Sequence, residues 1–279
     1  MIRRTGLAIC ALWILCSAVR PTGEERRATG EAVAASLYGQ AVVTLLHERF
    51  TRDDVSYILI ETGSGRIVDS RWPDASRAVP MGSLVKPFTA LAYGKSHAFR
   101  YPEFVCRGTE SGCWLPAGHG KVGIVEAIAH SCNAYFDALA AEVRFEDVAS
   151  EARRFSIAPP PEDAPPAAYV GRQGLWELRP EEMLRAFVAL LADPRAGVLR
   201  SGMEECARHG TAHALGEGLA KTGTAPCTHQ PKAPGDGFVI AFDRAATPRY
   251  GLLVRVHGVP GAEAAVVAAQ MMRVIREGR

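Results

Sequence analysis

The pattern of apolar and polar residues predicts a helix near the start of the chain and a β-hairpin after it. Apolar residues between Glu31 and Phe50 recur every three or four positions, as on one face of an amphipathic helix. The apolar run Val55–Ile60 and the shorter run Arg66–Val68 flank a glycine-containing turn, Thr62–Gly65. Two such runs around a short turn are typical of a β-hairpin.

The middle of the chain is helical in pattern and is interrupted by two irregular stretches. A helix is expected from Ser83 to about His97, and a second from Val122 to Arg144 that breaks near Ser131. Pro180–Ala192 is amphipathic and has proline at its first position, as helices prefer. Two stretches between these helices are rich in proline, or in glycine, proline and cysteine, and are therefore expected to be loops. These expected loops are Tyr101–His119 and Ala158–Ala168.

The last third of the chain reads as three strands followed by a helix. The strands are expected at Leu219–Ala225, Gly237–Phe242 and Tyr250–Val256, and the helix at Gly261–Glu277. Strands therefore occur early and late in the chain, with helices between them. This order predicts an α+β fold in which an antiparallel sheet brings its first and last strands together.

The first 18 residues have the features of a secretory signal peptide. Arg3 and Arg4 precede an apolar run, Leu7–Leu15, and small residues end the segment at Ala18. The run is short for a membrane span, so an uncleaved anchor is the weaker alternative, and a lipid attached to Cys16 is a third. We therefore expect export across the inner membrane to the periplasm or cell envelope, with a membrane tether as the alternative.

Composition indicates a globular protein and argues against a nucleic-acid partner. The chain has 279 residues, of which 48% are hydrophobic, enough to bury a full core. Its formal charge of +2 falls to zero once the two arginines of the signal segment are removed. A neutral chain without basic clusters lacks the electrostatic pattern of nucleic-acid binding.

Export makes disulfide bonds possible, and five cysteines lie beyond the signal segment. Cys106 and Cys113 are separated by a polar turn with two glycines, which predicts a disulfide between them. Cys206 with Cys227 is a less specific pairing. Cys132 is then the odd thiol and is expected to be buried.

A serine and a lysine one helical turn apart form the first candidate for catalysis. Ser83 and Lys86 lie on the same face of the expected helix, so the amine can approach the hydroxyl. A neutral lysine there would take the serine proton and create a nucleophile. The chain has five lysines and 27 arginines, and lysine is the one that loses its proton when desolvated. The simpler alternative is a serine that caps a helix.

Two further polar motifs follow. Ser131 and Asn133 supply a second hydroxyl and an amide at the helix break, although such residues are also common helix caps. Lys221, Thr222 and Thr224 offer a charge and two hydroxyls to a carboxylate, and the glycine between the threonines lets a ligand backbone lie against the strand. A solvent-facing edge strand with a bulge is the alternative.

Together these motifs, Ser-x-x-Lys, Ser-x-Asn and Lys-Thr-Gly in this order, resemble the transpeptidase domain of penicillin-binding proteins over about residues 55–279. The resemblance implies a serine β-lactamase/transpeptidase-like α+β fold, with an antiparallel sheet of about five strands flanked by helices and an all-helical subdomain. Most family members have glycine where this chain has Ala220. The expected division is a signal peptide at 1–18, an N-terminal helix and linker at 19–54, and the transpeptidase domain at 55–279.

The resemblance also implies a role for each motif residue. Ser83 would be the acylated nucleophile, Lys86 its base and Ser131 the proton shuttle. The backbone N–H groups of Ser83 and Thr224 would form the oxyanion hole. The residues expected to bind the D-alanyl-D-alanine stem peptide of peptidoglycan, or a β-lactam, are Asn133, Lys221, Thr222, Gly223 and Thr224.

No cofactor is expected, and no metal site. His209 and His213 are four apart, but Gly210 stands where a zinc protease helix has glutamate. No glycosyltransferase or pedestal module is recognised ahead of the catalytic motifs, so another cell-wall protein is expected to supply those functions.

The sequence thus predicts a DD-transpeptidase or DD-carboxypeptidase that binds β-lactams covalently. Two alternatives remain at this point. One is a serine β-lactamase, for which Glu177 is a candidate deacylation base, although its segment fits the transpeptidase pattern better. The other is a β-lactam or muropeptide sensor, or a docking module, without catalysis.

Overall fold

The computed structural model describes residues 37–227 and 235–277. Residues 37–49 are helical, as the apolar spacing predicted. The predicted signal peptide lies outside the described residues. Within them, no helix combines the length and the apolar character that crossing a membrane requires.

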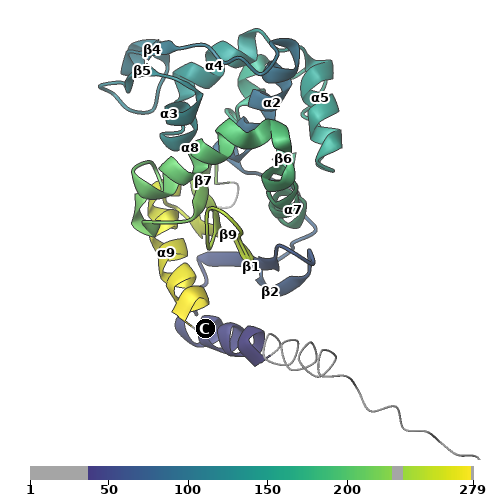
Figure 1. Ribbon diagram of the computed structural model, residues 1–279, viewed down its shortest axis with the longest axis vertical. Helices are drawn as coiled ribbons and strands as arrows, with labels where there is room; N and C mark the ends of the chain where they lie inside the picture. The colour runs from purple at the N-terminus through teal and green to yellow at the C-terminus, as the bar shows by residue number, and fades with distance from the viewer. Residues whose placement is uncertain (1–36, 228–234, 278–279) are drawn as a thin grey trace, which may run out of the picture.

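A five-stranded antiparallel sheet with the order β2-β1-β9-β8-β7 is the centre of the molecule (Figure 1). The early strand β1 pairs with the late strand β9, with Tyr57 opposite Val254, so the two ends of the domain meet as predicted. The strands are β1 (Val55–Glu61), β2 (Ile67–Arg71), β7 (Leu219–Ala225), β8 (Asp236–Phe242) and β9 (Tyr250–His257).

Both faces of the sheet are buried, and the alternation of side chains along the strands explains how. In β1, Ile58 and Ile60 enter one hydrophobic cluster, whereas Tyr57 and Leu59 enter the other. Successive side chains of a strand point to opposite faces, so a strand that is apolar throughout needs cover on both sides. The sheet is therefore the middle layer of three.

Helices supply the two outer layers. α9 (Gly261–Glu277) packs on β8 and β9, and its apolar residues share a cluster with Val42 and Leu46 of the helix at 37–49. On the opposite face, α7 (Pro180–Ala192) lies against β1 and β9, and α8 (Gly197–Arg208) contacts β7.

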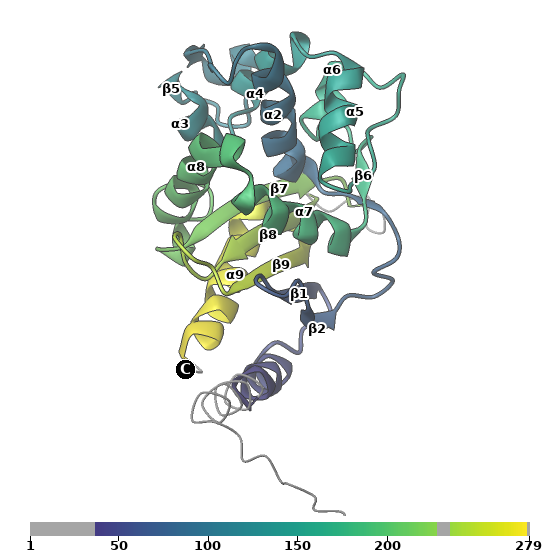
Figure 2. The ribbon, with the colours of Figure 1, turned by 45° about the vertical axis from the view of Figure 1, so that its right-hand side comes forward.

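The remaining helices gather at one end of the molecule, beyond α7 and α8 (Figure 2). This part is helical except for a two-stranded ribbon, so the expected all-helical subdomain carries one small sheet. The ribbon consists of β4 (Phe104–Cys106) and β5 (Gly120–Val122), and a second ribbon pairs β3 (Val79–Pro80) with β6 (Glu177–Leu178). The helices are α2 (Lys86–Ser96), α3 (Ile124–Ala129), α4 (Asn133–Ala141), α5 (Phe145–Arg154) and α6 (Pro166–Tyr169).

Short 3-10 turns connect several of these elements. One of them, η1 (Gly82–Val85), leads directly into α2. The others are η2 (Gly108–Ser111), η3 (Pro194–Ala196) and η4 (His213–Leu215).

Candidate active site

Ser83 lies where the sheet meets the helical end of the molecule. It belongs to η1, and neither η1 nor α2 has a side-chain cap, so Ser83 is not the helix cap that the simpler alternative required. The residue is partly exposed and lines a cavity of about 420 Å³. Its hydroxyl is therefore placed to meet a ligand.

Lys86 lies one turn further along and is completely buried. Its Nζ lies 2.8 Å from the carbonyl oxygen of Ser131, 2.8 Å from Oδ1 of Asn133, and 3.4 Å from Oγ of Ser131. Burial, followed by the charge of Lys221, holds the pKa of Lys86 well below its ordinary value. This shift favours the neutral amine, which can accept a proton.

Ser131 connects α3 to α4 in an unusual conformation. Its φ of 51° lies in the left-handed region, which residues other than glycine, asparagine and aspartate rarely adopt. This conformation ends one helix and starts the next, and it directs both the carbonyl and the hydroxyl of Ser131 toward lysine amines. Strain of this kind is found most often at functional sites.

Lys221 reaches the same hydroxyl from the sheet. Its Nζ lies 2.8 Å from Oγ of Ser131 and 2.7 Å from the carbonyl oxygen of Thr222. Burial lowers the pKa of Lys221 to about 8. The two lysines are completely buried and do not line the cavity, whereas Thr222 and Thr224 do. Lys221 thus lies behind the cavity wall and touches the Ser131 hydroxyl.

Close backbone contact holds β7 against the turn that carries Ser83. A Cβ on Gly223 would overlap the carbonyl oxygen of Met81, and a Cβ on Gly82 would overlap that of Thr224. Gly82 also has a φ of +55°, which glycine adopts without strain. These two glycines bring the backbone of Thr224 beside that of Ser83, where an oxyanion hole formed by their N–H groups would have to lie.

Residues outside the three motifs also line the cavity. Thr211 lines it, and Oγ1 of Thr211 lies 2.6 Å from Oγ1 of Thr222. Trp114 is 51% exposed and also lines the cavity, with its Nε1 donating to the carbonyl of His130. Thr211 belongs to none of the three motifs and lies only within the stretch, about residues 55–279, that resembles the family.

Glu177, the candidate deacylation base of a β-lactamase, lies elsewhere. It is in β6 opposite Pro80, and it lines a separate, proline-rich pocket with Leu175. No carboxylate lines the Ser83 cavity among residues 37–227 and 235–277.

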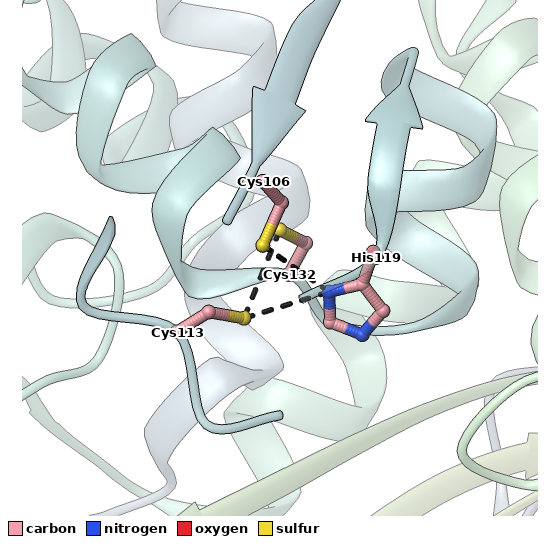
Figure 3. A group of neighbouring side chains, drawn as sticks. All are labelled: Cys106, Cys113, His119 and Cys132. Carbon is pink, nitrogen blue, oxygen red and sulfur yellow. Dashed lines mark hydrogen bonds between the residues drawn. The ribbon is translucent and has the colours of Figure 1, made fainter. Parts of the chain in front are cut away.

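The predicted disulfide between Cys106 and Cys113 is not formed, and both thiols are free. The loop does bring them together, but around His119. Its Nδ1 lies 3.6 Å from Sγ of Cys106 and 3.5 Å from Sγ of Cys113 (Figure 3). Cys132 is buried as expected and joins this group, with its Sγ 3.9 Å from that of Cys113.

The less specific pairing is not observed either, because no disulfide joins Cys206 to Cys227. Sγ of Cys206 lies 3.4 Å from Oγ1 of Thr211. The histidines that the sequence discounted as zinc ligands have other partners. Nδ1 of His209 lies 2.9 Å from a carboxylate oxygen of Glu205, and Nδ1 of His213 lies 3.2 Å from the backbone carbonyl oxygen of Gly210.

Solved structures of penicillin-binding proteins share this fold. Penicillin-binding protein 2 of Helicobacter pylori, solved in complex with MreC, aligns with a TM-score of 0.70 and 17% identity over 80% of this chain and 60% of that one. The D,D-transpeptidase domain of a peptidoglycan glycosyltransferase from Eggerthella lenta aligns with a TM-score of 0.70 and 14% identity, over 85% of this chain and 81% of that one. Penicillin-binding protein 2 of Pseudomonas aeruginosa aligns with a TM-score of 0.66 and 18% identity, over 87% of this chain and 74% of that one.

The chain therefore has the fold of penicillin-binding transpeptidase domains, and it spans 60% of the length of the Helicobacter pylori protein. The sequence identities are only 14–18%, so the similarity to these structures is a similarity of fold alone. No protein-family model matches the sequence, and no curated protein sequence is significantly similar to it.

Proposed function

We propose that this protein is a serine acyltransferase that acts on D-alanyl-D-alanine peptides of peptidoglycan and is acylated by β-lactams at Ser83. The observation that carries the proposal is the position of Lys86. A fully buried amine with a lowered pKa lies one helical turn from a cavity-lining serine and contacts Ser131 and Asn133. Burial of an amine costs free energy, and groups whose pKa is strongly shifted by burial cluster at functional sites.

In the acylation step, Oγ of Ser83 attacks the carbonyl carbon between the two D-alanines. The new C–O bond forms as the serine proton passes to Nζ of Lys86. The C–N bond then breaks, and the leaving D-alanine amine takes a proton from the Ser131 hydroxyl. Ser131 recovers a proton from Lys86, which returns to its neutral form. In β-lactams the broken bond is the ring amide, so the leaving group stays attached.

Substrate binding uses the cavity wall formed by β7. The backbone N–H groups of Ser83 and Thr224 would stabilise the oxyanion, a contribution of about 3 kcal/mol for one such donor. The hydroxyls of Thr222 and Thr224 face the cavity and would bind the terminal carboxylate, while Lys221 adds positive charge from behind. Asn133 would hold the substrate's peptide amide.

Deacylation distinguishes the transpeptidase from the β-lactamase. A β-lactamase of class A needs a carboxylate that activates water beside the acyl serine. Because no described carboxylate lines the cavity, the β-lactam adduct should be long-lived. This observation favours transfer to an amine, or slow hydrolysis, over rapid penicillin hydrolysis.

Two further parts of the proposal concern location and partners. The predicted signal peptide would deliver the protein to the periplasm or cell envelope, where peptidoglycan is made. Penicillin-binding protein 2 of Helicobacter pylori, whose structure is similar to this one, forms a complex with MreC. By analogy, we expect this chain to work with another cell-wall protein that supplies glycan polymerisation.

Turnover of a synthetic peptide ending in D-alanyl-D-alanine tests the proposal. We expect release of free D-alanine that depends on Ser83, Lys86 and Ser131, and a mixed product when an acceptor amine is added. Hydrolysis of penicillin at rates far above peptide turnover would indicate the β-lactamase. A folded protein that neither releases D-alanine nor forms a penicillin adduct would indicate the non-catalytic module.

A further inference from the structure

Three cysteines and one histidine form a compact cluster next to the Ser131 turn. The sulfur atoms of Cys106, Cys113 and Cys132 and the Nδ1 atom of His119 all lie within 4.8 Å of one another. The residues come from the end of β4, the loop after η2, the residue before β5, and the turn before α4 (Figure 3). The three cysteines are at most 5% exposed.

We propose that these four residues bind one Zn²⁺ ion in a tetrahedral Cys₃His site. Zinc–sulfur bonds of about 2.3 Å and zinc–nitrogen bonds of about 2.0 Å place tetrahedral ligand atoms roughly 3.5–3.8 Å apart. The separations here are 3.5 and 3.6 Å from Nδ1 of His119 to two sulfurs, and 3.9 Å between the sulfurs of Cys113 and Cys132. A disulfide, by contrast, requires two sulfurs at about 2.05 Å.

The histidine is oriented for this role. The ring of His119 stacks on that of His130 with centroids 5.4 Å apart, and Trp114 meets it edge-on at 5.5 Å. Its other nitrogen, Nε2, is buried and has no hydrogen-bond partner among the described residues. The polar contacts of the ring are therefore those of Nδ1 with the sulfurs.

The site would be structural, because four protein ligands leave no open position for water or substrate. Binding would release the protons of the three thiols to solvent and leave three thiolates and a neutral imidazole on the metal. No oxidant or reductant is involved. Cys132 stands between Ser131 and Asn133, so the metal would tie the strained turn at Ser131 to the ribbon formed by β4 and β5.

The metal site does not depend on the proposed function, but its effect on Ser131 and Asn133 does. Zinc content and acylation are therefore measured separately. The full chain, purified without added metal, should contain about one zinc per molecule. Replacement of zinc by Co²⁺ should give the intense visible bands of tetrahedral cobalt and a sulfur-to-cobalt charge-transfer band.

Variants test the ligand set. Cys113→Ser and His119→Ala should lose zinc, whereas His119→Cys, which keeps a fourth ligand, should retain it. Cys206→Ser is the matched control, because Cys206 is also buried but lies outside the cluster, and it should retain zinc. Loss of zinc should also slow penicillin acylation at least tenfold through displacement of Ser131 and Asn133.

Three results would overturn the proposal. The first is a folded wild-type chain that neither contains zinc nor takes up Zn²⁺ or Co²⁺ after thiol reduction. The second is a Cys106–Cys113 disulfide, seen as thiols that resist alkylation until they are reduced, in a protein without metal. The third is full zinc retention in Cys113→Ser. Misfolding of the variant could not explain this result, because misfolding would cause zinc to be lost.

Discussion

The Nζ atom of Lys221 donates a hydrogen bond to Oγ of Ser131 across 2.8 Å, although the two residues are 90 positions apart in the chain. Nζ of Lys86 lies 3.4 Å from the same oxygen. One hydroxyl is therefore shared by two buried amines, both with lowered pKa values. This arrangement lets a proton move between Lys86 and Lys221 through Ser131.

The two lysines predict a bell-shaped pH dependence of acylation by penicillin. Lys86 must be neutral, so the rate is lost as the pH falls through its lowered pKa. Lys221 must be charged, so the rate is lost as the pH rises through about 8. We expect the alkaline decline near pH 8 in the second-order rate constant of acylation, measured by stopped-flow or mass spectrometry.

Lys221→Arg separates charge from titration in this profile. Arginine stays protonated, so the alkaline decline should move above about pH 10 even if the rate itself falls. Lys95→Arg, at an exposed position of α2, is the control and should leave the profile unchanged. An alkaline decline that stays near pH 8 in Lys221→Arg would exclude Lys221 as its origin.

Ser131 should respond differently to alanine and to glycine. Both substitutions remove the hydroxyl and should abolish turnover of peptide substrate. Alanine keeps the left-handed strain, whereas glycine relieves it, so Ser131→Gly should be more stable than Ser131→Ala by about 1 kcal/mol. Urea unfolding of the two variants measures the difference. Equal stabilities would mean that the strained turn is not enforced in solution.

Gly223, the one glycine of β7, is predicted not to tolerate alanine. Gly223→Ala places a Cβ into the carbonyl oxygen of Met81, so β7 must move away from the turn that carries Ser83. A shift of about 1 Å costs roughly 100-fold in rate. Acylation kinetics measure the loss. Gly63→Ala, where nothing lies within 4 Å, is the control and should acylate at the normal rate.

Thr211 tests the cavity wall that the motifs did not identify. Its hydroxyl lies 2.6 Å from that of Thr222, so Thr211→Val should misplace a hydroxyl expected to bind the substrate carboxylate. We expect KM for a D-alanyl-D-alanine peptide to rise about tenfold, since a lost hydrogen bond to a charged group costs about 1.5 kcal/mol or more. Thr211→Ser should restore most of the affinity. Unchanged KM in Thr211→Val would exclude this role.

Much of the fold was predictable because its elements have strong periodic patterns. The bounds predicted for α7, β7 and α9 are those observed, and the alternating or wholly apolar strands indicated a buried sheet. α8 was missed because Gly197 and Gly202 weaken its helical pattern. Gly202 is nevertheless needed, since a Cβ there would crowd Ile128.

The candidate site was only partly predictable. Order and spacing of the motifs identified Ser83, Lys86, Ser131 and the β7 residues, because these depend on local sequence. The orientation of Lys221 behind the cavity wall depends on tertiary packing, which no motif encodes. The cysteines illustrate the same limit. Their spacing predicted a disulfide, because the contribution of His119 and Cys132 appears only once the loop folds against α4.

The most direct test of the central claim is the intact mass of the mature protein mixed with benzylpenicillin, followed over time for wild type and Ser83→Ala. We predict one persistent adduct of the full penicillin mass on the wild type and none on a folded Ser83→Ala protein. An adduct on folded Ser83→Ala, or an adduct that disappears within seconds as penicillin is hydrolysed, would contradict it.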